Sequence, residues 1–264
     1  MKPDFLYIGA PRAASTWLWR NLQAHPDIWV PPCKNIGWFH PRFQMYRLKI
    51  LRHFGGAVKP EDKAWYRRFF GRPFGSVRWY ASLFPTDQIA GEIAEAYCSL
   101  NEKRIAKIVK LNPQMKIIFV LRNPYERALS HARLGVLKRK GKAASTANML
   151  AHIDHPSSEA RSFYSVALKR WEAPFPAEQF FIRFYEDVQD DPRRFLTELY
   201  AFLGANYNGE VIEERVNTAP TVDLPEAVIQ HTARKYHEEI KVLAERFGGS
   251  AADWLTQVET IISE

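Results

Sequence analysis

The segment FLYIGAPRAASTWLWRNL at residues 5–22 restricts the fold more than any other part of this sequence. Its apolar run ends at Gly9, a turn of small residues carries Arg12, and an amphipathic stretch follows. This order predicts a buried strand over 4–9, a tight loop and a helix over 15–24. The free N–H groups and the dipole at the start of such a helix, together with one guanidinium, form a binding site for a phosphate-like anion.

A second segment of the same kind lies later in the chain. KIIFVL at 116–121 is continuous in β-branched and aromatic side chains, which is typical of a strand buried on both faces. RNPYERALS follows, and its proline is suited to the first turn of a helix. Arg122 therefore stands at the carboxyl end of a strand, where open α/β sheets bind ligands, and Ser130 lies in the next helix. The Arg122 and Ser130 side chains could therefore bind the same anion. This segment alone is equally consistent with another arrangement, in which Arg127 pairs with an acid of the helix and Ser130 faces solvent.

The remaining patterns alternate between helices and strands. The predicted helices cover 62–70, 101–111, 161–172, 191–203, 225–247 and 251–262, and a further strand covers 179–184. Residues 28–60 contain many helix breakers and are predicted to be irregular, 141–160 to be a loop or mobile insert, and 92–97 is ambiguous between strand and helix. This alternation predicts an α/β fold with a mainly parallel sheet flanked by helices, organised as a single domain over 1–264.

The charge of the chain is +8 and is unevenly distributed. Residues 103–142 hold twelve Lys or Arg against one acid, Glu126, which favours an anionic partner, although a solvated helix face explains 138–142 equally well. Cys33 and Cys98 are too few for a disulfide framework. Because the N-terminal apolar run is too short for a signal peptide and no run is long enough to span a membrane, we expect a soluble, cytoplasmic protein.

The first loop differs from the phosphate-binding loop of the nucleoside triphosphatases, GxxxxGK[ST]. Ala14 stands where that motif has its second glycine, and Ser15 stands where it has lysine. A P-loop kinase would therefore lack its phosphate-binding lysine. Alanine in place of glycine also predicts a turn that avoids a positive φ angle at residue 14.

Taken together, the two segments resemble the sulfotransferases that use 3′-phosphoadenosine 5′-phosphosulfate (PAPS). APRAASTWL is similar to that family's P-[KR]-x-G-T-T-x-L, and RNPYERALS is similar to R-[DN]-P-x-x-R-x-x-S. LQAHPDI at 22–28, GEIAEAY at 91–97, FYEDVQDDP at 184–192 and FLG at 202–204 extend the similarity over most of the chain. The resemblance is closer to the carbohydrate, tyrosyl-protein and bacterial branches than to the small-phenol cytosolic branch.

This resemblance implies a P-loop-like fold and transfer of a sulfuryl group from PAPS to a hydroxyl, or an amine, of a small-molecule, sugar or natural-product acceptor. The product would be 3′-phosphoadenosine 5′-phosphate (PAP), and no metal is required. The residues implied for the 5′-phosphosulfate and the adenine are Pro11, Arg12, Ala13, Ala14, Ser15, Thr16 and Trp17. Arg122 and Ser130 would hold the 3′-phosphate, and Arg215 stands where the family has an Arg-Lys-Gly loop. Arg12 would also stabilise the charge that grows on the leaving phosphate.

The acceptor side departs from the family pattern. In the carbohydrate branch a glutamate in KE-x-[HP]-[FY]-F is the general base, and Asn35 stands at that place here. Our candidates for the base are Glu95 first, Glu92 second and His40 third, against the alternative that each is only a solvated acid or a surface histidine. We expect the aromatic and basic segment 33–80 to wall the acceptor site.

The main alternative is a non-enzymatic protein that binds a polyanion or nucleic acid through 103–142. Its aromatic residues are not interleaved with that basic run, as stacking on single strands would require, so we expect no nucleic-acid partner. The acceptor and the oligomeric state stay open.

Overall fold

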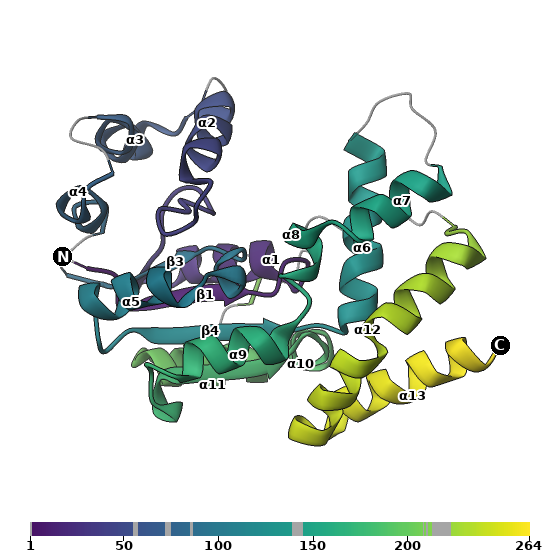
Figure 1. Ribbon diagram of the computed structural model, residues 1–264. Helices are drawn as coiled ribbons and strands as arrows, with labels where there is room; N and C mark the ends of the chain where they lie inside the picture. The colour runs from purple at the N-terminus through teal and green to yellow at the C-terminus, as the bar shows by residue number, and fades with distance from the viewer. Residues whose placement is uncertain are drawn as a thin grey trace.

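A sheet of five parallel strands lies at the centre of the described part of the chain (Figure 1). The computed structural model describes residues 2–54, 58–71, 75–84, 87–138, 145–207, 209, 211–212 and 223–264. The strands are β1 (Phe5–Gly9), β2 (Ile28–Trp29), β3 (Ile89–Ile93), β4 (Lys116–Leu121) and β5 (Phe180–Phe184), in the order β2-β3-β1-β4-β5. The predicted α/β fold with a parallel sheet is thus confirmed.

The central strands are built from side chains that are buried on both faces. All five residues of β1 are buried, as are the last five of β4. Phe5 pairs with Gly91 on one side and Lys116 on the other. A Cβ atom at position 91 would lie 2.4 Å from the Phe5 ring, so only glycine lets these two strands approach.

Helices cover both faces of the sheet. Trp17 of α1 (Ser15–Ala24) packs edge-on against Phe195 of α11 (Pro192–Leu203), and Phe195 also contacts Phe181 of β5. Tyr164 of α9 (Tyr164–Glu172) contacts Phe119 of β4 on the other face, beside α5 (Glu102–Leu111). Neighbouring side chains of a strand point to opposite faces, so the sheet is a middle layer between two layers of helices.

Two separate helical groups stand on the same side of the sheet in Figure 1. One consists of α2 (Phe43–Phe54), a 3₁₀ turn (Pro60–Asp62), α3 (Lys63–Phe70) and α4 (Val77–Ala81). The other consists of α6 (Pro124–Lys138), α7 (Thr146–Ile153) and α8 (Pro156–Glu159). Among the helices described, none has the length and apolar character needed to cross a membrane.

The C-terminal helices α12 (Glu226–Phe247) and α13 (Gly249–Ser263) pack against each other and against the second group. Gln257 of α13 accepts a hydrogen bond from the Asn123 amide at 2.9 Å. Trp254 donates to a carboxylate oxygen of Glu186 at 2.8 Å, in α10 (Tyr185–Asp190). The end of the chain is thereby joined to the loop that follows β4 and to helix α10, which follows β5.

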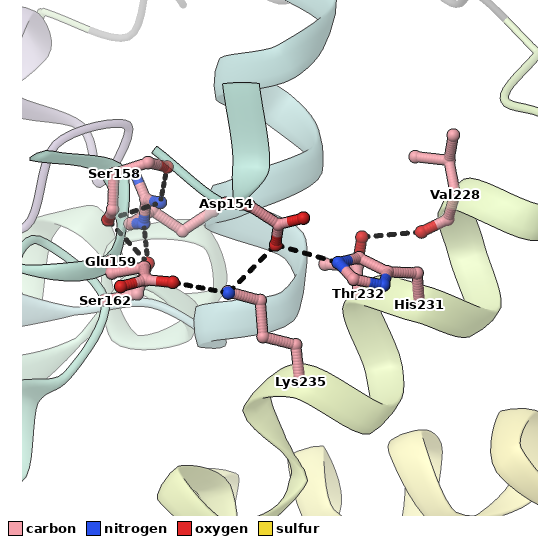
Figure 2. A network of polar contacts seen from close by, with 9 residues as sticks. Asp154, Ser158, Glu159, Ser162, Val228, His231, Thr232 and Lys235 are labelled. Atoms are coloured by element: carbon pink, nitrogen blue, oxygen red, sulfur yellow. Dashed lines mark hydrogen bonds and ion pairs between the residues drawn. The ribbon is translucent and has the colours of Figure 1, made fainter. Parts of the chain in front are cut away.

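A polar network fixes α7 and α8 to α12 (Figure 2). The Lys235 ammonium lies 2.9 Å from Asp154 and 2.5 Å from Glu159, and His231 contacts Asp154 at 2.8 Å. These contacts hold the segment after α7 in one position relative to the long helix α12.

The predicted secondary structure was wrong in two regions. Residues 28–60, predicted to be irregular, contain β2 and α2, because the helix breakers of that region lie outside the helix itself. Residues 141–160, predicted to be a loop, contain α7 and α8 in their described part, where Met149 and Ile153 are buried and Ser145 caps the first helix. The ambiguous stretch 92–97 begins with the end of strand β3.

Candidate active site

The loop between β1 and α1 has the left-handed backbone geometry of a tight anion-binding turn. Arg12 has a φ angle of 71° and Ala14 one of 54°, so the expectation that Ala14 avoids a positive φ was wrong. The Tyr7 hydroxyl donates to the Ala13 carbonyl at 2.8 Å, and Leu18 N–H donates to the Ala14 carbonyl at 2.9 Å. These bonds hold residue 14 in a conformation that alanine adopts at a cost.

The structure brings the two predicted anion-binding segments together. An Arg122 Nη atom donates to the Arg12 carbonyl at 2.8 Å, and Arg12 Nε donates to Ser130 Oγ at 3.0 Å. The Arg122 guanidinium lies 4.8 Å over the ring of Tyr185 and 3.2 Å from Glu126. Burial, followed by the Arg122 charge, lowers the pKa of Arg12. Two cations this close leave the surrounding space attractive to an anion.

A lysine that the sequence analysis left out completes the loop. Lys34 Nζ donates to Ser15 Oγ at 2.9 Å and to Thr16 Oγ1 at 2.7 Å, and it lies 3.5 Å from Glu95. Ser15 in turn donates to the Glu95 carboxylate. The sequence could have identified Lys34, because it aligns with the lysine of the KE-x-[HP]-[FY]-F motif, immediately before Asn35. A cation, two hydroxyls and a carboxylate therefore meet at the start of α1.

The other two candidate bases lie elsewhere. Glu92 is buried and accepts hydrogen bonds from Gly37 N–H at 2.8 Å and from the Tyr80 hydroxyl at 2.6 Å, with Tyr97 at 3.2 Å. Burial raises its pKa to about 7. His40 accepts from the backbone N–H of Arg42, and burial lowers its pKa to about 4.

A cavity of about 1350 Å³ opens over the start of α1, between α2 and α3 on one side and α6 on the other. The predicted site residues that line it are Pro11, Arg12, Ala14, Ser15, Thr16, Trp17, Glu95, Arg122 and Ser130. Ala13, Glu92 and His40 are not among its described lining residues, and Arg215 lies outside the described part of the chain. Glu95 is therefore the candidate base that faces the cavity.

The segment 33–80 lines one side of this cavity, but few of its aromatic side chains do. Tyr46 and Tyr66 line the cavity, whereas Trp38 stacks on Tyr80 with ring centres 4.6 Å apart. Phe39 packs on the same Tyr80 ring. No cluster of three or more His, Cys, Asp or Glu side chains suited to a metal ion occurs among the residues described.

Comparison with known proteins agrees with this geometry. A model described as "Sulfotransferase family" matches residues 3–209. The chain is 30% identical over 210 residues to "Heparan sulfate glucosamine 3-O-sulfotransferase 6" of Homo sapiens, covering 76% of this chain and 52% of that protein. It is 26% identical over 221 residues to "Bifunctional heparan sulfate N-deacetylase/N-sulfotransferase 4" of Mus musculus, covering 78% and 23%. The chain thus spans only part of the length of both relatives.

Among solved structures, the sulfotransferase from Alicyclobacillus acidocaldarius superposes with a TM-score of 0.65 at 19% identity. The alignment covers 96% of this chain and 99% of that one. At this level of identity the likeness concerns the fold alone.

Proposed function

This chain belongs to the sulfotransferase family, and we propose that it transfers a sulfuryl group from PAPS to a hydroxyl group of a sugar-containing acceptor. The observation that carries the proposal is the meeting of the two corners, in which Arg12 contacts Ser130 and Arg122 contacts the Arg12 carbonyl. PAPS is anionic at two separate places, and two adjacent cationic corners suit such a molecule. When bound, PAPS would supply the transferable sulfuryl group.

The residues present fit this donor. Arg122 Nε is buried, and no residue of the described chain accepts a hydrogen bond from it, so the guanidinium retains a donor for a ligand oxygen. The Ser130 hydroxyl, which lines the cavity as Arg122 does, could also donate a hydrogen bond to a ligand oxygen. The cavity is larger than the roughly 300–1000 Å³ of a typical small-molecule site, which leaves room for a nucleotide and an acceptor together.

The residues at the start of α1 have complementary chemical roles in the proposed reaction. Arg12 and Lys34 would stabilise the negative charge that grows on the leaving phosphate, because they are already in place and partly shielded from water. Glu95 would accept the proton of the acceptor hydroxyl. Ser15 and Lys34 orient the Glu95 carboxylate through the contacts described above.

Glu92 is better suited to positioning than to proton transfer. Its carboxylate binds Gly37 N–H and two buried tyrosine hydroxyls, all within the protein. It therefore fastens the segment that carries Lys34 to strand β3. His40, enclosed beside Tyr46, would have a structural role as well.

The sugar acceptor is proposed from the two curated relatives, both named for heparan sulfate. One of them is named an N-sulfotransferase and the other a 3-O-sulfotransferase, so an amine acceptor is the second candidate. Asn35 stands where the carbohydrate branch has its glutamate base, and asparagine cannot accept a proton. An amine acceptor would depend less on a base at this position, because it is already nucleophilic.

Thermal unfolding with nucleotides tests the donor. A ligand that binds only the folded state raises the melting temperature, so PAP should stabilise the protein while ATP at the same concentration should not. Transfer is then followed by mass spectrometry with labelled PAPS and a panel of sugar hydroxyl and amine acceptors. Equal stabilisation by ATP would point to a kinase-like site. Salt-sensitive DNA binding with no transfer to any acceptor would instead support the polyanion binder.

A further inference from the structure

Arg161 is a cation of the cavity wall that the proposed donor site does not use. It lies between α8 and α9 and lines the cavity. Its backbone N–H donates to the Ser158 carbonyl at 3.2 Å. Its guanidinium forms no hydrogen bond or ion pair with any residue that the structure describes, although it is half-buried. A guanidinium that lines a cavity without a protein partner is available to pair with an anionic ligand.

The backbone around Arg161 is held firmly. Ser158 and Ser162, on either side of it, both accept hydrogen bonds from the fully buried Arg127, the latter at 2.6 Å. Glu159 belongs to the polar network with Lys235 in Figure 2. The direction of the Arg161 side chain into the cavity therefore follows from a fixed segment of chain.

Arg161 lines the same cavity as Glu95, the candidate base. Burial raises the pKa of Tyr46, the Arg161 charge lowers it and the Glu95 charge raises it, so both charges act on the same phenol. Arg161 also contributes to lowering the pKa of His131, next to Ser130, to about 3, after burial, Arg127 and His152. Arg161 thus lines the same cavity as Tyr46 of α2 and His131 of α6.

The charge balance of the cavity favours the same conclusion. The proposed donor site uses Arg12, Lys34 and Arg122. Four more cations line the cavity, namely Lys49, Lys59, Arg133 and Arg161. The acids among its described lining residues are Asp62 and Glu95. Four cations thus line the cavity beyond the three that the proposed donor site uses, against two acids among the described lining residues.

We propose that the acceptor of this enzyme carries an oxyanion, a carboxylate or a sulfate or phosphate ester, which pairs with Arg161 while the acceptor hydroxyl faces Glu95. This inference rests on the proposed function, because it assigns the acceptor class of the same site. A neutral acceptor of the same shape would leave the guanidinium without this ion pair. The oxyanion therefore determines specificity and orients the hydroxyl toward the base.

Binding to the protein saturated with PAP tests the proposal without requiring turnover. The probes are 4-nitrophenyl β-D-glucuronide, the 6-sulfate of 4-nitrophenyl β-D-glucoside, and the neutral 4-nitrophenyl β-D-glucoside. They share the ring and the aromatic group and differ at one position, so they also separate a carboxylate from a sulfate ester. Titration calorimetry should show at least about tenfold tighter binding of one anionic probe than of the neutral one, which is 1.4 kcal/mol.

Three variants identify the residue. Arg161→Gln should remove the preference for the anionic probe and leave PAP affinity unchanged, and Arg161→Lys should restore part of the preference. Arg170→Gln is the matched control, because Arg170 lies on the adjoining helix and pairs with Glu102 at 3.2 Å, away from the cavity. A thermal melt checks that each variant is folded.

Each contrary outcome is decisive. If the wild type with PAP bound has no preference for either anionic probe, including the case in which no probe binds, the inference is overturned and the donor assignment stands. If Arg161→Gln weakens PAP as strongly as the probe, Arg161 belongs to the donor site and the inference is again overturned. If PAP itself fails to bind the wild type, the proposed function fails first.

Discussion

Replacement of Glu92 by glutamine should remove a defined pH dependence from the stability of the protein. Glu92 is buried, and burial raises its pKa from the usual 4.5 to about 7. Between these two pH values the folded state holds a proton on Glu92 that the unfolded state has released. Stability therefore falls as pH rises through this window, and the effect is complete above about pH 7.

The magnitude follows from the pKa difference. Each pH unit corresponds to about 1.4 kcal/mol, so the change from 4.5 to about 7 corresponds to a loss of ~3 kcal/mol in the free energy of unfolding. The Glu92→Gln variant keeps an oxygen for Gly37 N–H and has no titrating proton. Its stability relative to the wild type should therefore improve by ~3 kcal/mol between pH 4.5 and pH 8.

Urea unfolding followed by tryptophan fluorescence at pH 4.5, 6, 7 and 8 measures this difference. Other titrating groups are common to both proteins, so their effects cancel in the comparison. Glu245→Gln, at an exposed position of α12, is the control and should follow the wild type at every pH. A constant stability difference between wild type and Glu92→Gln over this range would refute the reasoning.

Two further predictions concern the reaction. Arg122→Ala should weaken PAP binding by about 10- to 100-fold, because a charged hydrogen-bonding group contributes about 1.5–3 kcal/mol, and calorimetry that finds unchanged affinity would remove Arg122 from the donor site. Glu95→Gln should lower kcat for a hydroxyl acceptor by about 10²- to 10⁴-fold with PAP affinity retained, as measured by mass-spectrometric turnover. An active Glu95→Gln together with an inactive but folded Glu92→Gln would reverse the assignment of base and positioning residue.

The parts of the fold that could be predicted are those specified by local sequence. β1 and β4 are contiguous apolar runs, and Pro124 marks the start of α6, so both strand–loop–helix corners follow from a few adjacent residues. Helices α7 and α8 are stabilised mainly by distant partners, such as Lys235 for Asp154 and Glu159. A sequence rich in alanine, serine and histidine gives no periodic pattern from which such contacts could be read.

The same distinction applies to the candidate site. The approach of Arg12 to Ser130 follows from the pairing of β1 with β4, and each of these strands was predicted from its apolar run. The position of Lys34 depends on a segment that folds back onto β3, where Asn35 N–H donates to the Ile93 carbonyl at 2.8 Å. The burial of Glu92 depends on tyrosines elsewhere in the chain. Neither residue could be assigned its place from sequence spacing alone.

The hydrogen bonds from α13 have a practical consequence for any shortened version of this protein. The family match ends at residue 209, but Gln257 and Trp254 lie beyond it. They form hydrogen bonds with Asn123 and Glu186, the residues next to Arg122 and Tyr185. Ending the gene at residue 209 would keep both strand–loop–helix corners, and it would still remove the hydrogen bonds that α13 makes to the residues that follow β4 and β5. If such a truncated protein were inactive, the cause would be the loss of the stabilising contacts from α13. The result would not test the chemical roles of the residues in the motifs.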